Sequence, residues 1–161
     1  MSVRPARSGD AAALAQLWFD LRAEEAGTRD PERSPRDLAP FHELAARRCR
    51  EETTLLLVAH SGDRAVGFYC GRIRGAVGEG LDLYVVPDAR RQGVAMTLVK
   101  SALAWYASRG AVRLTGALRG GAGSRAFWAT VWEKEPSRLR VAREAAGVEW
   151  RMRSIGPGRE G

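Results

Sequence analysis

Residues 83–96 read Leu83-Tyr84-Val85-Val86-Pro87-Asp88-Ala89-Arg90-Arg91-Gln92-Gly93-Val94-Ala95-Met96. This order places a strand, a charged turn, a glycine and the start of a helix in direct succession. The unpaired N–H groups of a first helical turn and the positive end of the helix dipole can converge on a phosphate. Gly93 lets the backbone approach such an anion because it has no Cβ. The stretch therefore predicts an anion-binding loop.

Hydrophobic spacing on both sides of this loop predicts the other elements. A helix of about four turns follows the loop and ends at Gly110. The other predicted helices begin after the turn at 8–10, cover about 38–50 beyond a loop rich in proline and charge at 26–40, and cover 124–132. Strands are expected at 3–6, 53–60, 65–73, 79–86, 112–118, 139–143 and 148–155. The order indicates an α+β protein with one parallel crossover near residue 90.

The length and composition favour one compact domain. A chain of 161 residues, 45% of them hydrophobic, can bury one core but is short for two. We expect a single domain over 1–161 with a disordered tail at 156–161. No run of about 18 uncharged apolar residues occurs, and Arg4 and Arg7 interrupt the start of the chain, so we expect a cytoplasmic protein. Two cysteines and two histidines without ligand spacing argue against a metal.

The net charge of +7 is unevenly distributed. Residues 1–85 carry 12 basic and 13 acidic side chains, whereas residues 86–161 carry 14 and 6. The basic half contains the glycine loop, so a small polyanionic cofactor is favoured over nucleic acid, for which no basic motif interleaved with aromatics is present. Solvated arginines on helix surfaces would explain many of these charges equally well. We expect neither a nucleic-acid nor a membrane partner.

The loop resembles the phosphate-binding signature of the GCN5-related N-acetyltransferase (GNAT) family, which is Gln or Arg, two residues, Gly, one residue, then Gly or Ala. Arg90, Gly93 and Ala95 satisfy it. With the strands and helices around it, the resemblance extends over residues 3–155. It implies a GNAT-like central twisted mixed sheet of about seven strands flanked by about four helices, splayed between strands 79–86 and 112–118. The alternative is a glycine that only eases a turn from strand to helix.

The resemblance also implies acetyl-CoA as acyl donor. Its pyrophosphate would bind the amides of residues 91–96, and its pantetheine would lie beside strand 79–86. The cofactor-binding residues implied are Leu83, Tyr84, Val85, Arg90, Arg91, Gln92, Gly93, Val94, Ala95, Met96 and Trp128. The function implied is transfer of an acetyl group to a primary amine by direct attack in a ternary complex.

An attacking amine must first lose a proton, because an ammonium ion has no lone pair. Glu79 lies eleven residues before Arg90, where some members of the family carry a glutamate that acts as general base. Asp82 on the same strand is the rival, and an amine that arrives neutral or uses another base is a third possibility. Neighbouring strand residues face opposite sides, so only one of the two acids is expected to face a cleft. Either acid could also be a solvated carboxylate at a strand end.

One position departs from the family pattern. Where many members carry a tyrosine that protonates the departing thiolate, this chain reads Ser124-Arg125-Ala126-Phe127-Trp128. An indole does not release its proton usefully at neutral pH, which leaves the general acid unassigned. The alternative function is therefore a non-catalytic acyl-CoA sensor or scaffold that retains the acetyltransferase fold.

The acceptor is predicted only by class, as a small-molecule or peptide amine. In this family it usually enters over the first two helices and their connection, here residues 20–43. That segment carries seven acids against four arginines, which suits a cationic amine. Ordinary exposed helix charges would produce the same count. The sequence is compatible with a homodimer.

Overall fold

The computed structural model describes residues 1–28, 31–116, 139–144 and 147–152, the last two ranges by their backbone alone. Contacts divide the chain into two compact units. The first comprises Met1–Cys70 and Asp82–Ala102, and the second comprises Gly71–Leu81 and Leu103–Gly161. Three elements run through both units: β3 (Arg64–Arg74), β4 (Val77–Val85) and α3 (Val94–Ser108). That residues 1–161 form one domain stays a prediction.

The first unit holds four strands in the order β1-β2-β3-β4, with β1 at Ser2–Pro5 and β2 at Thr54–Ser61. β1 pairs antiparallel with β2, from Ser2 opposite His60 to Pro5 opposite Leu57. β2 and β3 join through a tight turn in which Gly62 has a φ of +59°. This confirms the hairpin predicted from the two apolar runs and their polar turn.

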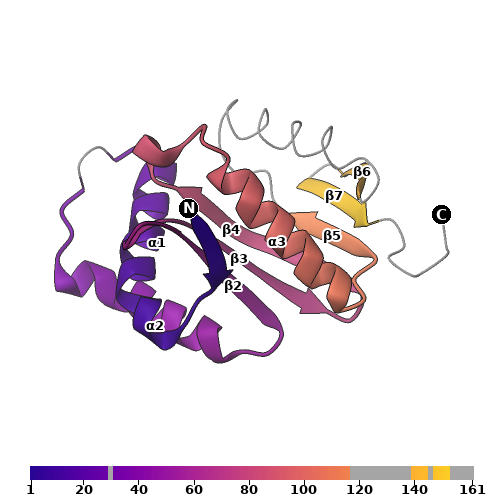
Figure 1. Ribbon diagram of the computed structural model, residues 1–161, viewed down its shortest axis with the longest axis horizontal. Coiled ribbons are helices and arrows are strands. Elements are labelled where there is room, and N and C mark those ends of the chain that lie inside the picture. Colours follow the sequence, from indigo (N-terminus) through magenta and orange to yellow (C-terminus); the bar gives the residue numbers. More distant parts are fainter. Residues whose placement is uncertain (29–30, 117–138, 145–146, 153–161) are drawn as a thin grey trace. The chain divides into compact units, whose positions relative to one another are not determined.

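Two helices of the first unit, α1 (Ala11–Glu25) and α2 (Pro35–Arg50), lie side by side in Figure 1. α1 buries Leu14, Leu17 and Trp18, and the Trp18 ring packs against Phe68 of β3 at 4.7 Å between centroids. These apolar residues recur at helical spacing, so burial of this face drives the packing of α1.

The second helix begins earlier than the sequence predicts. Ser34 caps α2 by accepting a hydrogen bond from the Asp37 amide, while the Asp37 carboxylate accepts one from the Ser34 amide. Pro35 occupies the first helical position, where its missing N–H costs nothing. The helix predicted from about Leu38 therefore starts at Pro35, because the capping box at Ser34 and Asp37 outweighs the tendency of a proline and its charged neighbours to form a loop.

The second unit orders its strands β3-β4-β5-β7-β6. β5 (Arg113–Gly116) pairs in parallel with Val77–Gly80 of β4 and antiparallel with β7 (Gly147–Met152), which forms a hairpin with β6 (Leu139–Glu144) in Figure 1. The closing hairpin is thereby confirmed. Tyr106 of α3 is fully buried, and its hydroxyl donates to the Glu79 carbonyl at 3.0 Å.

The described elements, seven strands with one parallel pair and three α-helices, confirm the α+β class. The predicted helix 124–132 and the tail 156–161 lie outside the described residues. Pairing of β4 with β5 is described up to Gly80 opposite Gly116, so the splay beyond that point stays a prediction. None of the described helices is long and apolar enough to cross a bilayer.

Candidate active site

The predicted loop connects the end of β4 to α3. After Val85 a 3-10 turn covers Pro87–Ala89, and α3 begins at Val94. Between them Arg91 has a φ of +62° and Gly93 a φ of +82°, both in the left-handed region. For an arginine this conformation costs about 1–2 kcal/mol relative to the right-handed one. Backbone outliers of this kind concentrate at binding sites, and here they bend the chain around the start of α3.

Six successive amides of this loop and helix start have no acceptor within the part of the chain that the structure describes, namely those of residues 91–96. The first helical hydrogen bond of α3 runs from the Thr97 amide to the Gly93 carbonyl at 3.0 Å. N–H groups that follow one another through left-handed and helical conformations form a concave donor set for anions. The arrangement is therefore competent to hold a phosphate.

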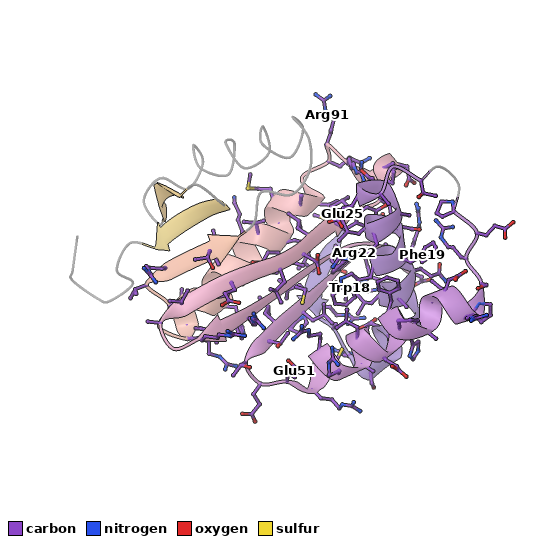
Figure 2. All side chains as sticks on the ribbon, turned by 180° about the vertical axis from the view of Figure 1, so that it is seen from behind. Trp18, Phe19, Arg22, Glu25, Glu51 and Arg91 are labelled. Carbon is purple, nitrogen blue, oxygen red and sulfur yellow. The ribbon has the colours of Figure 1, made fainter. Side chains whose placement is uncertain are left out.

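The space beside Gly93 is open. A Cβ placed there would meet no heavy atom within 4 Å. Behind the loop the Val94 side chain is buried, which anchors the helix start, while Arg91 and Gln92 are exposed. Figure 2 shows the Arg91 side chain projecting away from the ribbon. The predicted contacts Ala95 and Met96 are half-buried in the first turn of α3.

Arg90 does not turn its guanidinium toward these amides. Its Nε donates to the Val85 carbonyl at 2.8 Å, and its Nη2 pairs with Glu24 of α1 at 2.6 Å. The guanidinium carbon also lies 5.5 Å from the centre of the Tyr84 ring. The Glu24 carboxylate raises the pKa of Arg90, which remains charged. The sequence placed Arg90 in the motif, but only the structure identifies these partners.

The strand residues predicted beside the pantetheine differ in exposure. Leu83 is half-buried, whereas Tyr84 and Val85 are 6% and 7% exposed and belong to the core. Burial raises the pKa of the Tyr84 hydroxyl, and the nearby Asp20 and Glu24 carboxylates raise it further. Because the Tyr84 and Val85 side chains are buried, an acyl donor lying along this strand would contact the backbone more than these two side chains. Trp128 lies outside the described residues.

Glu79, the first predicted base, belongs to the second unit and sits in β4 beside two arginines of β3. Its Oε2 accepts from Arg72 Nε at 2.5 Å. Its Oε1 lies 3.9 Å from Arg74 Nε, beyond hydrogen-bond length, and has no donor among the described residues. The side chain is 25% exposed. One carboxylate oxygen is therefore left to accept a proton or a hydrogen bond.

Asp82, the rival base, belongs to the first unit and has both oxygens occupied. Arg22 donates to Oδ1 at 3.0 Å and to Oδ2 at 3.1 Å, and the Trp18 indole donates to Oδ2 at 3.0 Å. The Asp82 side chain is 10% exposed. In Figure 2 Trp18, Arg22 and Glu25 lie along α1, and Glu25 takes a further bond from Arg22. Asp82 joins β4 to α1, and each of its oxygens already accepts at least one hydrogen bond.

These arginine partners are the functional neighbours that sequence reasoning missed. Several acids of residues 20–43 also have partners in the described structure, and one of these partners, Arg90, comes from outside the segment. Asp20 pairs with Arg33, Glu24 with Arg90, and Glu25 with Arg22. Asp37 is used in the cap of α2. A count of charges along the chain cannot anticipate such pairing, since Arg90 lies 66 residues from Glu24.

Metal ligation finds no support in the part of the chain described here. No group of three or more His, Cys, Asp or Glu is arranged to hold an ion among those residues. Neither Cys49 nor Cys70 forms a disulfide within the described part of the chain.

Residues 15–130 match the Acetyltransferase (GNAT) family. The chain is 36% identical over 122 residues to an aminoglycoside N(6')-acetyltransferase type 1 of Klebsiella aerogenes, covering 67% of this chain and 72% of that protein.

Solved structures agree with the fold. The PaiA N-acetyltransferase of Thermoplasma acidophilum, solved in complex with coenzyme A, superposes with a TM-score of 0.70 at 15% identity, over 92% of this chain and 96% of that one. A ribosomal-protein-alanine N-acetyltransferase of Brucella melitensis superposes with a TM-score of 0.65 at 20% identity, over 94% and 96%. At these identities the likeness concerns the fold alone.

Proposed function

Because this chain belongs to the GNAT acetyltransferase family and is an N-acetyltransferase, we propose that it transfers an acetyl group from acetyl-CoA to a primary amine, by direct attack in a ternary complex. The donor supplies an acyl group activated as a thioester. The chain's own residues bind its phosphates, hold the amine and accept a proton. The solved complex of a fold neighbour with coenzyme A supports the choice of donor.

The observation that carries this proposal is the run of six amides at residues 91–96 without an acceptor among the described residues. A pyrophosphate offers the charged oxygens that such a run needs, and hydrogen bonds to a charged group contribute about 1.5–3 kcal/mol each. Gly93 leaves the approach open, since nothing lies within 4 Å of a Cβ placed there. The positive end of the α3 dipole favours the same charge.

For the proton of the amine we propose Glu79, acting directly or through one water. Its Oε1 has no hydrogen-bond donor within the described chain, whereas both oxygens of Asp82 accept from Arg22. Arg72 holds the other oxygen of Glu79 and so fixes the orientation of the carboxylate. This difference favours Glu79 over Asp82 as base. An amine that binds already neutral would need neither.

The departing thiolate needs little help in this proposal. A thiol of pKa about 8.5 is a tolerable leaving group at neutral pH, so a water or Ser124 can supply the proton and a tyrosine is dispensable. We propose that the Trp128 side chain forms an apolar wall beside the pantetheine. Both residues lie outside the described part of the chain, and these roles rest on their place in the sequence.

For the acceptor we propose a small-molecule or peptide amine, with an aminoglycoside as the first compound to test. The relative at 36% identity is named for acetylation of an aminoglycoside, which supports that order. Three acids of residues 20–43, namely Asp20, Glu24 and Glu25, are paired with arginines, so recognition of a polycation would depend on the exposed Glu32 and Glu43 and on groups outside the described residues.

The test is a panel of amines incubated with acetyl-CoA, in which release of free thiol is followed and the product mass is measured. The panel includes an aminoglycoside, a polyamine and peptides with a free N-terminus or a lysine. We expect thiol release that depends on one class of amine, with a gain of one acetyl group in that amine. A protein that binds acetyl-CoA but releases no thiol with any amine would be a sensor, and the proposal would be wrong.

A further inference from the structure

The Arg90 side chain joins three parts of the first unit at the entrance of the loop. Its Nε donates to the carbonyl of Val85, the last residue of β4, at 2.8 Å. Its Nη2 pairs with Glu24 in the last turn of α1 at 2.6 Å. Its guanidinium lies over the Tyr84 ring. The backbone of Arg90 directly precedes the six amides, so whatever fixes this side chain fixes the start of the loop.

The guanidinium of Arg90 already has three contacts within the protein, so it is not an open site for a phosphate. A carboxylate, a carbonyl and an aromatic ring contact it, and Arg91, the next residue, provides an exposed cation instead. The Arg90 side chain is 39% exposed and that of Glu24 50%, so solvent screens the pair and its free-energy contribution is modest. The pair can still affect binding through the geometry of the adjacent amides, because hydrogen bonds to a phosphate weaken when donors are misaligned.

We propose that Arg90 is a positioning residue held in place by Glu24, and that this ion pair aligns the amides of residues 91–96 for the phosphates of the donor. The inference rests on the proposed function, because it concerns the same loop. It assigns Glu24, an acidic residue, a favourable effect on the binding of a polyanion. Nothing in the sequence motif predicts a role for Glu24.

The sign of the Glu24 effect separates positioning from simple electrostatics. A carboxylate near a polyanion repels it, so removing the charge should tighten binding if charge alone matters. If Glu24 acts by holding Arg90, removing the same charge should weaken binding. Glu25 offers the matched control, since it stands next to Glu24 on α1 and pairs with Arg22 at 3.1 Å instead.

The experiment measures binding of coenzyme A by calorimetry to the full chain and to four variants: Glu24→Gln, Arg90→Gln, the double variant, and Glu25→Gln. Glutamine at position 90 is the other residue that the family signature accepts, and it can still donate to the Val85 carbonyl. We expect Glu24→Gln and Arg90→Gln each to weaken binding about three- to fivefold, the scale of a screened ion pair. The double variant should equal either single variant, because both remove the same contact.

Kinetics and thermal melts distinguish positioning from a purely structural contact, since loss of the latter would change the melting temperature and not the KM alone. The KM for acetyl-CoA should rise in Glu24→Gln with kcat unchanged, while the melting temperature stays close to that of the parent. Glu25→Gln should leave coenzyme A affinity within error or slightly tighter. Tighter or unchanged binding in Glu24→Gln, or additive effects in the double variant, would overturn the positioning role.

The result also separates this inference from the proposed function. If the parent chain binds no coenzyme A, the proposed function is wrong and the inference is wrong with it. If the parent binds and Glu24→Gln binds equally well, only the inference is wrong.

Discussion

Replacement of Gly93 by valine probes the loop most sharply, because folding and binding respond to different features of that position. The φ of +82° is unfavourable for any residue with a Cβ, and a left-handed conformation costs about 1–2 kcal/mol. No atom lies within 4 Å of the added Cβ, so no clash enlarges that cost. For a chain of this length we expect the melting temperature to fall by roughly 2–8 °C and the protein to remain folded.

Binding of the donor should suffer much more. The valine side chain would add bulk in the open space beside Gly93, within the run of amides at residues 91–96 that we propose to bind the phosphates. A hydrogen bond to a charged group contributes about 1.5–3 kcal/mol, so the loss of one such bond weakens binding roughly 10- to 100-fold. Calorimetric titration with coenzyme A measures this directly.

Gly62→Val supplies the control for this prediction. Gly62 has a φ of +59° in the turn between β2 and β3, and a Cβ there also meets nothing within 4 Å. Its replacement should lower stability by a similar amount and leave coenzyme A affinity unchanged. A folded Gly93→Val variant that binds coenzyme A as tightly as Gly62→Val does would refute the reasoning, because the loop could not then be the phosphate site.

Three further predictions test the packing, the base and the acid stability. Gly78→Ala should cost about 1–3 kcal/mol by chemical denaturation, because its Cβ would lie 2.6 Å from the buried Tyr106 ring, whereas Gly9→Ala, which meets no atom, should cost little. Glu79→Gln should lower turnover by about 10²- to 10⁴-fold, most at low pH where free amine is scarce, with coenzyme A affinity unchanged; a pH–rate profile like the parent's would exclude the carboxylate as base. The hydrogen bond from Arg4 holds the pKa of Asp10 below its ordinary value of about 3.9. The ionised Asp10 carboxylate therefore stabilises the fold above about pH 4, and this contribution is lost as the pH falls further. Asp10→Asn should therefore destabilise the protein at pH 7 and converge with the parent in acid; equal melting temperatures at pH 7 would contradict this.

Local patterns in the sequence predicted most of the described fold. Gly62 indicates a hairpin turn, Gly110 indicates a helix end, and the apolar run before Pro87 indicates a strand, and the structure confirms each. These features depend on residues a few positions apart, so periodicity and turn chemistry suffice. The start of α2 was predicted late, because Pro35 reads as a breaker unless the cap at Ser34 is recognised.

The site was only partly accessible from sequence for a different reason. The place of the loop between a strand and a helix, with Gly93 in it, could be anticipated from residue type and spacing. The partners of Glu79, Asp82 and Arg90 could not, because each depends on which strand or helix lies alongside in the folded chain. Two acids three residues apart look equivalent in the sequence. The structure distinguishes them, because Glu79 has one carboxylate oxygen without a hydrogen-bond donor among the described residues, whereas both oxygens of Asp82 accept hydrogen bonds.

The most direct test of the phosphate loop is an NMR titration of the uniformly ¹⁵N-labelled chain with coenzyme A, in which the amide resonances of residues 91–96 are followed. All six residues carry an N–H, and none of these amides has an acceptor among the described residues. We predict that these amides shift together, with one dissociation constant, and become protected from hydrogen exchange when the ligand binds. Saturable binding that moves other resonances and leaves these six in place and unprotected would contradict the account.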